Sequence, residues 1–166
     1  GRYYITAEQA KQSRCTLYAK WIYSAYVERK DMTFHIGTEQ EAELIANTNL
    51  LEADIPDKIA YGGKEYPVTK IAKNAFENAT IQKVTIASSV KYIDPDAFSN
   101  CKNLQQVYMN GMNLTLGKCF PQHISLYAYE ESMAYKKYEE EGYTGAKNAY
   151  ASQITYVLNG GQNAVD

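Results

Sequence analysis

One segment of this chain recurs at a nearly constant spacing, and this recurrence constrains the fold more than any other feature. Residues 68–79 are matched 22 residues later by residues 90–101, and a further 22 residues lead to a third, weaker copy. The matching residues are Ile71 with Ala75 and Phe76, Ile93 with Ala97 and Phe98, and Cys119 with Phe120. A period of this length is typical of a solenoid, in which each unit buries its apolar side against its neighbours.

A strand pattern lies between the copies of this segment. Residues 81–86 match residues 104–109 at an offset of 23, and apolar and polar residues alternate in both. The expected inward residues are Val84, Ile86, Val107 and Met109, and the expected outward residues are Lys83, Thr85, Gln106 and Tyr108. Because side chains alternate between the two faces of a strand, each unit is predicted to contain a strand with one buried and one outward face.

The first unit, which begins at residues 55–59, is nine residues longer than the next. The surplus, residues 61–67, contains a Gly-Gly pair that suits the tip of a tight β-hairpin. We expect this hairpin to project Tyr61, Lys64 and Tyr66 from the solenoid. Each unit is then predicted to be a strand, a turn, a second short strand, and the Ala-Phe pair on a helical or 3₁₀ turn.

This pattern resembles the BspA-type leucine-rich repeats, also called the Treponema pallidum type, whose units read Val-x-Ile-Pro, then Ile-x-x-x-Ala-Phe and a cysteine. The resemblance extends over roughly residues 31–141 and implies a leucine-rich-repeat solenoid, mainly β with some α, of about three units of 22–23 residues. The proline after the strand is present at Pro56 but is replaced by Ala87 and Asn110 in later units. The third unit also has Cys119 where alanine is usual, as expected for a degenerate repeat next to a cap.

The N-terminal part is predicted to be β structure. Strands are expected over residues 2–6, 15–21 and 32–36, whereas residues 39–46 fit either a strand or a short helix. Residues 16–21, which read TLYAKW, resemble the closing strand of the Listeria–Bacteroides (InlB B-type) repeat, a β-grasp-like module of bacterial surface proteins. This resemblance implies that residues 1–30 are an N-terminal β segment, the remnant of a surface-repeat module.

The C-terminal part is predicted to close the solenoid with a helix. A strand is expected over residues 124–127, followed by a capping helix over 130–141 with Met133, Ala134 and Tyr138 on its apolar side. Three glutamates at 139–141 oppose the helix dipole, so we expect that end to fray. After it we expect a loop over 143–152, a strand over 153–158 and a tail over 159–166. The expected divisions of the chain are residues 1–30, a solenoid with its cap over 31–142, and a C-terminal strand and tail over 143–166.

Charge and hydropathy set limits on the partners. The formal net charge is −2 at pH 7, which gives no electrostatic reason to expect nucleic-acid binding. No apolar run approaches the roughly 18 residues of a membrane span, and residues 1–20 lack a signal-peptide core. Because the chain starts at Gly1, we expect it to be part of a longer protein.

No pattern of catalytic or metal-binding residues emerges from the sequence. His35 and His123 are far apart, and the chain lacks the Gly-x-Ser-x-Gly, phosphate-loop, His-Glu-x-x-His and dinucleotide motifs. The segment Asp94-Pro95-Asp96 is typical of a turn cap. The three cysteines are odd in number and widely spaced, at Cys15, Cys101 and Cys119, which favours buried small side chains over a disulfide framework or a zinc site. We therefore expect no enzyme activity, no metal and no cofactor.

The outward side chains of successive strands are predicted to line up in rows across the sheet. Aligning the strands by sequence places Asp54, Thr85, Tyr108 and Ser125 in one row, and Glu52, Lys83, Gln106 and His123 in another. The chain has 16 tyrosines, whose apolar rings and polar tips suit half-buried sheet faces as well as contact surfaces. The candidate ligand-binding residues are Lys83, Thr85, Gln106 and Tyr108 on the sheet, and Tyr61 and Tyr66 on the hairpin. A merely solvated surface is the alternative for both.

The resemblance to BspA-type repeats implies a secreted or cell-surface bacterial protein that uses its repeats for adhesion to a protein of a host or a neighbouring cell. On this view the chain is extracellular and is part of a longer secreted protein. A monomer is the default expectation. Two alternatives are a carbohydrate-binding module, with tyrosines as platforms for sugar rings, and a spacer that holds another domain away from the cell wall. Fold-level resemblance does not choose among them.

Overall fold

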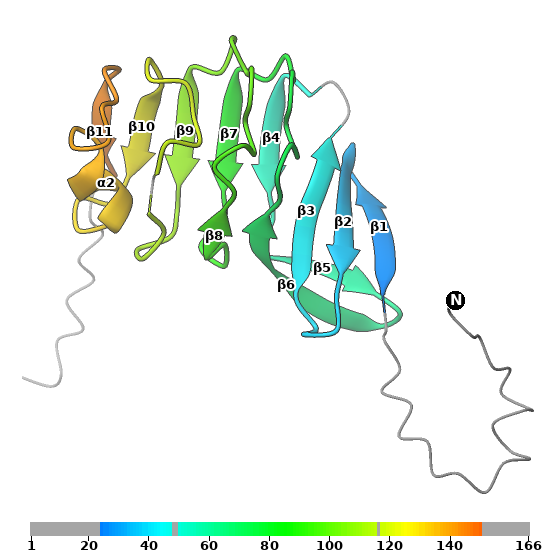
Figure 1. The fold of residues 1–166 in the computed structure, drawn as a ribbon. Coiled ribbons are helices and arrows are strands. Elements are labelled where there is room, and N and C mark those ends of the chain that lie inside the picture. Colours follow the sequence, from blue (N-terminus) through cyan, green and yellow to red (C-terminus); the bar gives the residue numbers. More distant parts are fainter. Residues whose placement is uncertain (1–23, 48–49, 116, 151–166) are drawn as a thin grey trace, which may run out of the picture.

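The computed structural model describes residues 24–47, 50–115 and 117–150, in which the chain forms an elongated solenoid (Figure 1). The fold is mainly β, as predicted, with a single short helix in the described residues near the C-terminal end. Strands lie side by side along the solenoid, from β1 at one end to β11 at the other. The expected strands over residues 2–6, 15–21 and 153–158 lie outside the described residues, as does Cys15.

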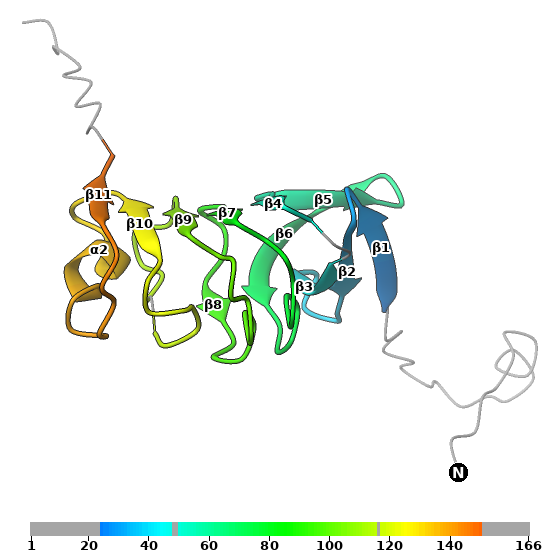
Figure 2. The same ribbon diagram turned by 90° about the horizontal axis from the view of Figure 1, so that it is seen from above.

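A parallel sheet runs along one side of the solenoid. Its strands, in spatial order, are β4 (Glu52–Ile55), β7 (Lys83–Ile86), β9 (Gln106–Met109), β10 (Ser125–Ala128) and β11 (Lys147–Ala149). Figure 2 shows this sheet along one side and the return segments, with helix α2 (Met133–Lys137) and strand β8 (Tyr92–Ile93), on the other. All neighbouring pairs are parallel because every coil returns to the same end before its next strand begins.

A mixed sheet forms the N-terminal end. Besides β8, its strands are β1 (Ala25–Arg29), β2 (Met32–Ile36), β3 (Ala42–Asn47), β5 (Lys58–Tyr61) and β6 (Lys64–Ile71). The order is β1-β2-β3-β6-β5, and β8 pairs with β6. The segment that fitted either a strand or a helix is strand β3, because Ala42 and Leu44 alternate into the core. The predicted hairpin is confirmed: β5 and β6 are antiparallel around Gly62 and Gly63, whose φ angles of 57° and 76° suit a two-residue turn.

The expected division of the chain at residues 30/31 and 142/143 stays a prediction. Strand β1 pairs with β2 across the first boundary, and β11 pairs with β10 across the second. The strands on either side of each boundary therefore belong to one sheet.

The Ala-Phe signature forms the centre of the core. Phe76 and Phe98 stack with ring centroids 4.7 Å apart and planes 7° apart, and Phe120 follows Phe98 at 4.7 Å with a tilt of 39°. All three rings are buried. Each such ring contributes about 2–3 kcal/mol of hydrophobic free energy, and the stacked geometry adds about 0.5–1.5 kcal/mol for each pair.

The return segments next to these phenylalanines are turns, not helices. Asn74, Asn78 and Asn100 have φ angles of 61°, 57° and 59°, a region in which asparagine is tolerated better than most residues. Backbone N–H groups of the first return segment donate hydrogen bonds to carbonyl oxygens of the second. These bonds run from Phe76 N to Ala97 O at 2.8 Å and from Asn78 N to Ser99 O at 2.9 Å. Backbone hydrogen bonds therefore join these coils on the return side as well as in the sheet.

Two further predictions about these turns hold. The Asp94 carboxylate accepts a hydrogen bond from Asp96 N at 3.0 Å, which is the predicted cap. Cys101 and Cys119 are buried, and the Cys101 thiol donates to Phe76 O at 2.9 Å. Burial raises the pKa of the Cys101 thiol to about 11 and that of Cys119 to about 12. Both thiols are therefore protonated at neutral pH and act as small apolar side chains.

The C-terminal cap differs from the prediction. The helix expected over residues 130–141 is limited to α2 (Met133–Lys137), because the chain turns over 138–142, where three glutamates oppose the helix dipole. Ser132 caps its start and accepts from Tyr135 N at 3.2 Å. Ala134 and Tyr138 are buried as expected, but Met133 is 37% exposed and does not belong to the apolar side. The residues expected to be loop over 143–152 contain β11, which pairs with β10 through backbone hydrogen bonds.

Candidate functional site

The candidate site is the outward face of the parallel sheet. In strands β7, β9 and β10 the second and fourth residues are buried, and the first and third are partly exposed. The buried residues of these strands are Val84, Ile86, Val107, Met109, Leu126 and Ala128. The predicted assignment of inward and outward residues in β7 and β9 is therefore confirmed.

Strand register places the outward residues in two rows. The first row contains Glu52, Lys83, Gln106 and Ser125, and the second contains Asp54, Thr85, Tyr108, Tyr127 and Asn148. Four of the six predicted ligand-binding residues, Lys83, Thr85, Gln106 and Tyr108, lie together on β7 and β9.

The predicted alignment is wrong at the last strand by two residues. Ser125 belongs to the row of Gln106, not to that of Tyr108, and His123 precedes the strand. The predicted rows match Ile124 with Val107, but in the structure Leu126 pairs with Val107. Ile124 is buried before the strand begins, as Leu104 is before β9. The structure therefore places Tyr127 beside Tyr108.

A stacked aromatic ridge, defined here as Lys83, Tyr108 and Tyr127, crosses the two rows, because the two tyrosines belong to the second row and Lys83 belongs to the first. The Tyr108 and Tyr127 rings have centroids 4.3 Å apart and planes 6° apart. On the other side of Tyr108, Lys83 Nζ lies 5.4 Å from the ring centroid, and it also forms an ion pair of 3.3 Å with Glu52. Both faces of the Tyr108 ring are thus covered, so this ring presents its edge and hydroxyl group to solvent.

A second aromatic group lies beyond the strand ends, next to the ridge. The Tyr129 and Tyr150 rings meet edge to face, with centroids 5.0 Å apart and planes 70° apart. The Tyr150 hydroxyl donates to Asn110 Oδ1 at 3.1 Å. Burial, followed by the neighbouring Tyr108 and Tyr129 hydroxyls, raises the pKa of Tyr150 to about 12. This hydroxyl therefore stays protonated at neutral pH and can act as the donor to Asn110.

The hairpin contributes less surface than predicted. Tyr61 is 39% exposed, in agreement with the prediction. The expectation that Tyr66 projects from the hairpin is wrong: this residue is 6% exposed and belongs to the core. Its strand continues through the buried Val68, so Tyr66 lies on the inward face of the same alternation.

The sequence-based prediction also missed Tyr127, Tyr129, Tyr150, Asn110 and Asn148. Extending the alternation of β10 by two residues would have found Tyr127 and Tyr129. Tyr150 and Asn148 follow a polar segment with no strand signal, so only the backbone pairing of β11 reveals where they lie.

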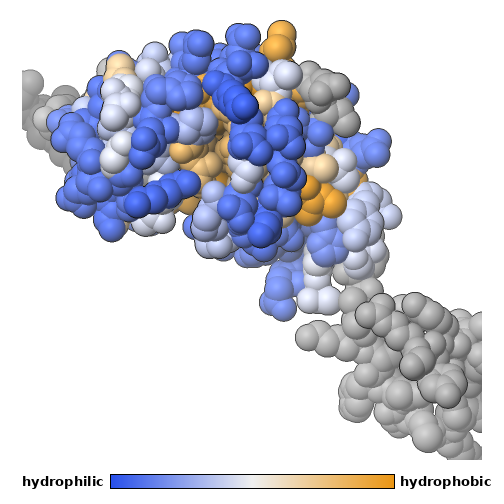
Figure 3. All heavy atoms as spheres, turned by 45° about the horizontal axis from the view of Figure 1, so that its top comes forward, coloured by the Kyte–Doolittle hydropathy of each residue, from blue (hydrophilic) through white to orange (hydrophobic). Residues whose placement is uncertain are grey.

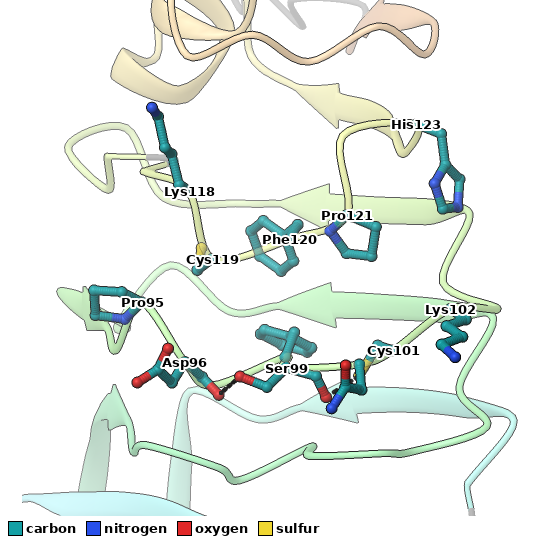
Figure 4. Close-up of a pocket in the computed structure, with 12 residues that line it drawn as sticks. Pro95, Asp96, Ser99, Cys101, Lys102, Lys118, Cys119, Phe120, Pro121 and His123 are labelled. Atoms are coloured by element: carbon teal, nitrogen blue, oxygen red, sulfur yellow. Dashed lines mark hydrogen bonds between the residues drawn. The ribbon is translucent and has the colours of Figure 1, made fainter.

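The return side carries a hollow of about 450 Å³ between the second and third coils. Figure 3 views the return side obliquely from above, and shows a mostly hydrophilic surface in which hydrophobic atoms come to the surface at a hollowed place. The hollow arises because 15 residues connect β9 to β10, whereas 19 connect β7 to β9. Figure 4 shows Lys118 pointing away from the gap between the coils. Its lining is polar as well as apolar and includes Asp96, Lys102 and His123, so this hollow is a second candidate beside the sheet face.

The described residues do not gather candidate metal ligands or the two histidines into one site. They contain no group of three or more His, Cys, Asp or Glu side chains that could hold a metal ion. His35 lies on β2 beside Ser24 and Tyr26, whereas His123 lies before β10 in the solenoid. In the part of the chain that the structure describes, no helix is both long and apolar enough to cross a membrane.

Comparison with known proteins supports the repeat architecture. Residues 64–130 match the family described as "BspA type Leucine rich repeat region (6 copies)". No curated protein matches the chain. The match does not include the N-terminal residues, so their resemblance to the InlB B-type repeat stays a prediction.

Three solved structures of bacterial proteins match this chain. A leucine-rich repeat protein from Bacteroides capillosus is 27% identical with a TM-score of 0.50, and the match covers 66% of this chain and 85% of that one. A leucine rich cell surface protein from Faecalibacterium prausnitzii is 22% identical, with a TM-score of 0.47 and coverage of 61% and 26%. A leucine-rich repeat protein from Bacteroides ovatus is 20% identical, with a TM-score of 0.41 and coverage of 67% and 31%. This chain is therefore similar to BspA-type leucine-rich repeats over residues 64–130, and its fold is similar to that of a bacterial leucine-rich repeat protein over two thirds of its length.

Proposed function

We propose that this chain is a non-enzymatic binding module of a bacterial surface or secreted protein, and that it binds a protein partner through the outward face of its parallel sheet. The observation that carries this proposal is the stacked aromatic ridge on that face, in which Lys83, Tyr108 and Tyr127 hold one another in place. The extracellular location follows from the resemblance of the repeats to the BspA type and is proposed with it, and a monomer is proposed as the default state.

The ridge has the properties of a protein-binding hot spot. Tyrosine offers a large amphipathic contact area with only two side-chain torsions to fix, and it is enriched where interfaces concentrate their binding energy. Here the stack between Tyr108 and Tyr127 fixes both rings before any partner arrives. Less conformational entropy is then lost on binding. Lys83 and Glu52 add a charged pair at one end of the ridge, which suits a partner with polar groups.

The ridge itself does not suit a sugar. A pyranose ring stacks on an open aromatic face, and both faces of Tyr108 are covered by Lys83 and Tyr127. A spacer would not require an ordered aromatic row on its surface. These two alternatives therefore have less support at this position than a protein partner.

The test is a binding screen of the purified chain against a panel of extracellular-matrix proteins, with affinity measured by biolayer interferometry. The informative variants are Tyr108→Ala and Lys83→Ala. Tyr92→Ala is a matched control, because Tyr92 on β8 is 48% exposed and has Lys70 Nζ 5.9 Å from its ring centroid, but it belongs to the mixed sheet. Tyr61→Ala tests the hairpin; shortening the hairpin would also remove the buried Tyr66.

We expect Tyr108→Ala to weaken the affinity for a partner about 30-fold, as for an interface residue worth about 2 kcal/mol. The Tyr92→Ala variant is expected to bind like the parent chain. Equal losses in Tyr108→Ala and Tyr92→Ala, or a loss confined to Tyr61→Ala, would contradict the proposed site. A folded chain that binds no protein of a broad panel would favour the spacer.

A further inference from the structure

We infer that the corner formed by Tyr129, Tyr150, Asn110 and Asn148, here called the tyrosine corner, is a binding site for one ring of a neutral carbohydrate. This site is distinct from the aromatic ridge, and the inference does not depend on a protein partner. It rests on three observations: the orientation of the Tyr150 ring, the hydrogen-bonding groups that remain on the two asparagines, and the lack of charge on the outward positions of strands β9, β10 and β11.

The hydrogen bond of Tyr150 determines how its ring lies. Tyr150 follows β11, and its hydroxyl reaches Asn110, which follows β9. Strand β10 lies between them, and neighbouring strands are about 4.8 Å apart, so about 10 Å between the two backbones is covered by the Tyr150 side chain, its hydrogen bond and the Asn110 side chain. A tyrosine side chain that covers much of this distance has to lie along the surface. Tyr150 is partly exposed, so part of this ring is accessible to a ligand from solvent.

Tyr129 forms a wall beside this platform. Its ring plane is 70° from that of Tyr150, and the side chain is 37% exposed. A flat ring with a second ring standing beside it makes a corner in which the apolar face of a pyranose can contact one ring and its edge the other. The ridge lacks this property, because Tyr108 and Tyr127 are nearly parallel.

The two asparagines are oriented by hydrogen bonds within the protein, and each leaves one polar group for a ligand. Asn110 accepts from Tyr150 through Oδ1, so its Nδ2 is directed elsewhere and can donate. Asn148 donates through Nδ2 to Leu126 O at 3.2 Å, which leaves its Oδ1 to accept. One donor and one acceptor beside a stacking platform match the hydroxyl groups of a sugar, each of which can both donate and accept.

The outward residues of β9, β10 and β11, together with the first residue after each of these strands, carry no charge, whereas the exposed Glu130 and Glu131 follow Tyr129. On β9, β10 and β11 and just beyond their ends, they are Gln106, Tyr108, Asn110, Ser125, Tyr127, Tyr129, Asn148 and Tyr150. The charged outward residues of the sheet are on β4 and β7, where Glu52, Asp54 and Lys83 lie. This half of the face therefore suits a neutral, hydroxyl-rich ligand better than an acidic or basic one.

The experiment is isothermal titration of the full chain with neutral oligosaccharides. The probes are cellohexaose, xylohexaose and maltohexaose for hexose and pentose polymers, and chitohexaose for N-acetylhexosamine polymers. A proline-rich peptide is titrated alongside, since aromatic surfaces also bind such segments. The variants are Tyr129→Ala, Tyr150→Ala and Tyr150→Phe, and each is checked for folding by circular dichroism. Tyr26→Ala is the control, because Tyr26 is 69% exposed at the other end of the solenoid.

We expect at least one oligosaccharide to bind, with the affinity reduced about tenfold in Tyr129→Ala and Tyr150→Ala and unchanged in Tyr26→Ala. Tyr150→Phe keeps the platform but frees Asn110, so an intermediate loss is expected. Because the ligand is neutral, the affinity should not change between about 0.05 and 0.5 M salt. Binding of chitohexaose alone would indicate an N-acetylated sugar, and binding of one of the other probes would indicate a hexose or pentose without that group.

The inference is overturned if no oligosaccharide binds at about 10 mM, the range of the weakest specific binding. It is also overturned if binding survives in both Tyr129→Ala and Tyr150→Ala, or if only the proline-rich peptide binds. Lys83→Ala separates the two proposals, since it should weaken the protein partner at the ridge and leave sugar binding unchanged. Failure at one site therefore leaves the proposal for the other intact.

Discussion

Replacing Phe98 with alanine removes the central ring of the phenylalanine stack. This ring is 2% exposed and contacts both Phe76 and Phe120 at centroid distances of 4.7 Å. Truncation of a buried phenylalanine to alanine costs about 3–5 kcal/mol, and two aromatic contacts place Phe98 at the upper end of this range. Phe120→Ala loses one tilted contact from a ring that is 6% exposed, so its effect should be about 1 kcal/mol smaller.

The free energy of unfolding would be measured by urea denaturation followed by circular dichroism. Phe98→Leu is the matched control, because leucine keeps most of the buried apolar surface but loses both ring contacts. It should cost about 1–3 kcal/mol, the sum of two aromatic pairs. The reasoning would be refuted if Phe98→Ala cost no more than Phe120→Ala, or if Phe98→Leu were as stable as the parent chain. Either result would mean that the stacked rings contribute only their hydrophobic area.

Three further predictions concern the turns and the cap. Gly145→Ala should destabilise the chain by about 2 kcal/mol or more, because an added Cβ would lie 2.1 Å from Ile124 O. Gly117→Ala should cost only about 1 kcal/mol, because the space around it is open and the cost comes from its φ of 54°. Thermal unfolding of the two variants compares these costs. The raised pKa of Cys101, about 11, means that the protonated thiol favours the folded state, so its contribution is complete below the ordinary thiol pKa and is lost as the pH rises towards 11. Urea denaturation at a series of pH values should therefore show a steeper alkaline loss of stability in the parent chain than in Cys101→Ala, and equal slopes would contradict the burial argument. Ser132→Ala should cost about 1 kcal/mol in the same assay by removing the cap of α2, and a variant as stable as the parent chain would contradict this role of Ser132.

Much of the fold could be predicted because the repeat encodes it redundantly. The Ala-Phe pair recurs at the period of the coil, so the stack of Phe76, Phe98 and Phe120 follows from the sequence alone. The alternation in β7 and β9 fixes which face is buried, since a shift by one residue would expose every apolar side chain. The Gly-Gly pair likewise determines the hairpin, because few residues tolerate two successive positive φ angles.

The remaining features were less predictable because their cause is not local. Strand β11 is formed by Lys147, Asn148 and Ala149, which carry no strand pattern, and it exists because β10 offers an unpaired edge. The register of β10 depends on the shorter connection from β9, which apolar residue matching does not reveal. Half of the candidate surface lies on these two strands, so the sequence indicated the Lys83 and Tyr108 side of the face and missed the tyrosine corner.

The parallel register explains how such a surface can arise without a change in the core. Outward side chains at equivalent positions of neighbouring strands are about one strand spacing apart, about 4.8 Å. That spacing is close to the preferred distance of stacked rings, and Tyr108 and Tyr127 are observed at 4.3 Å. Two tyrosines at one outward position of adjacent coils are therefore brought into a stack by the solenoid itself, while Val107 and Leu126 beside them keep the core unchanged. The proposed binding surface is thus formed by outward residues that the packing of the repeats does not constrain.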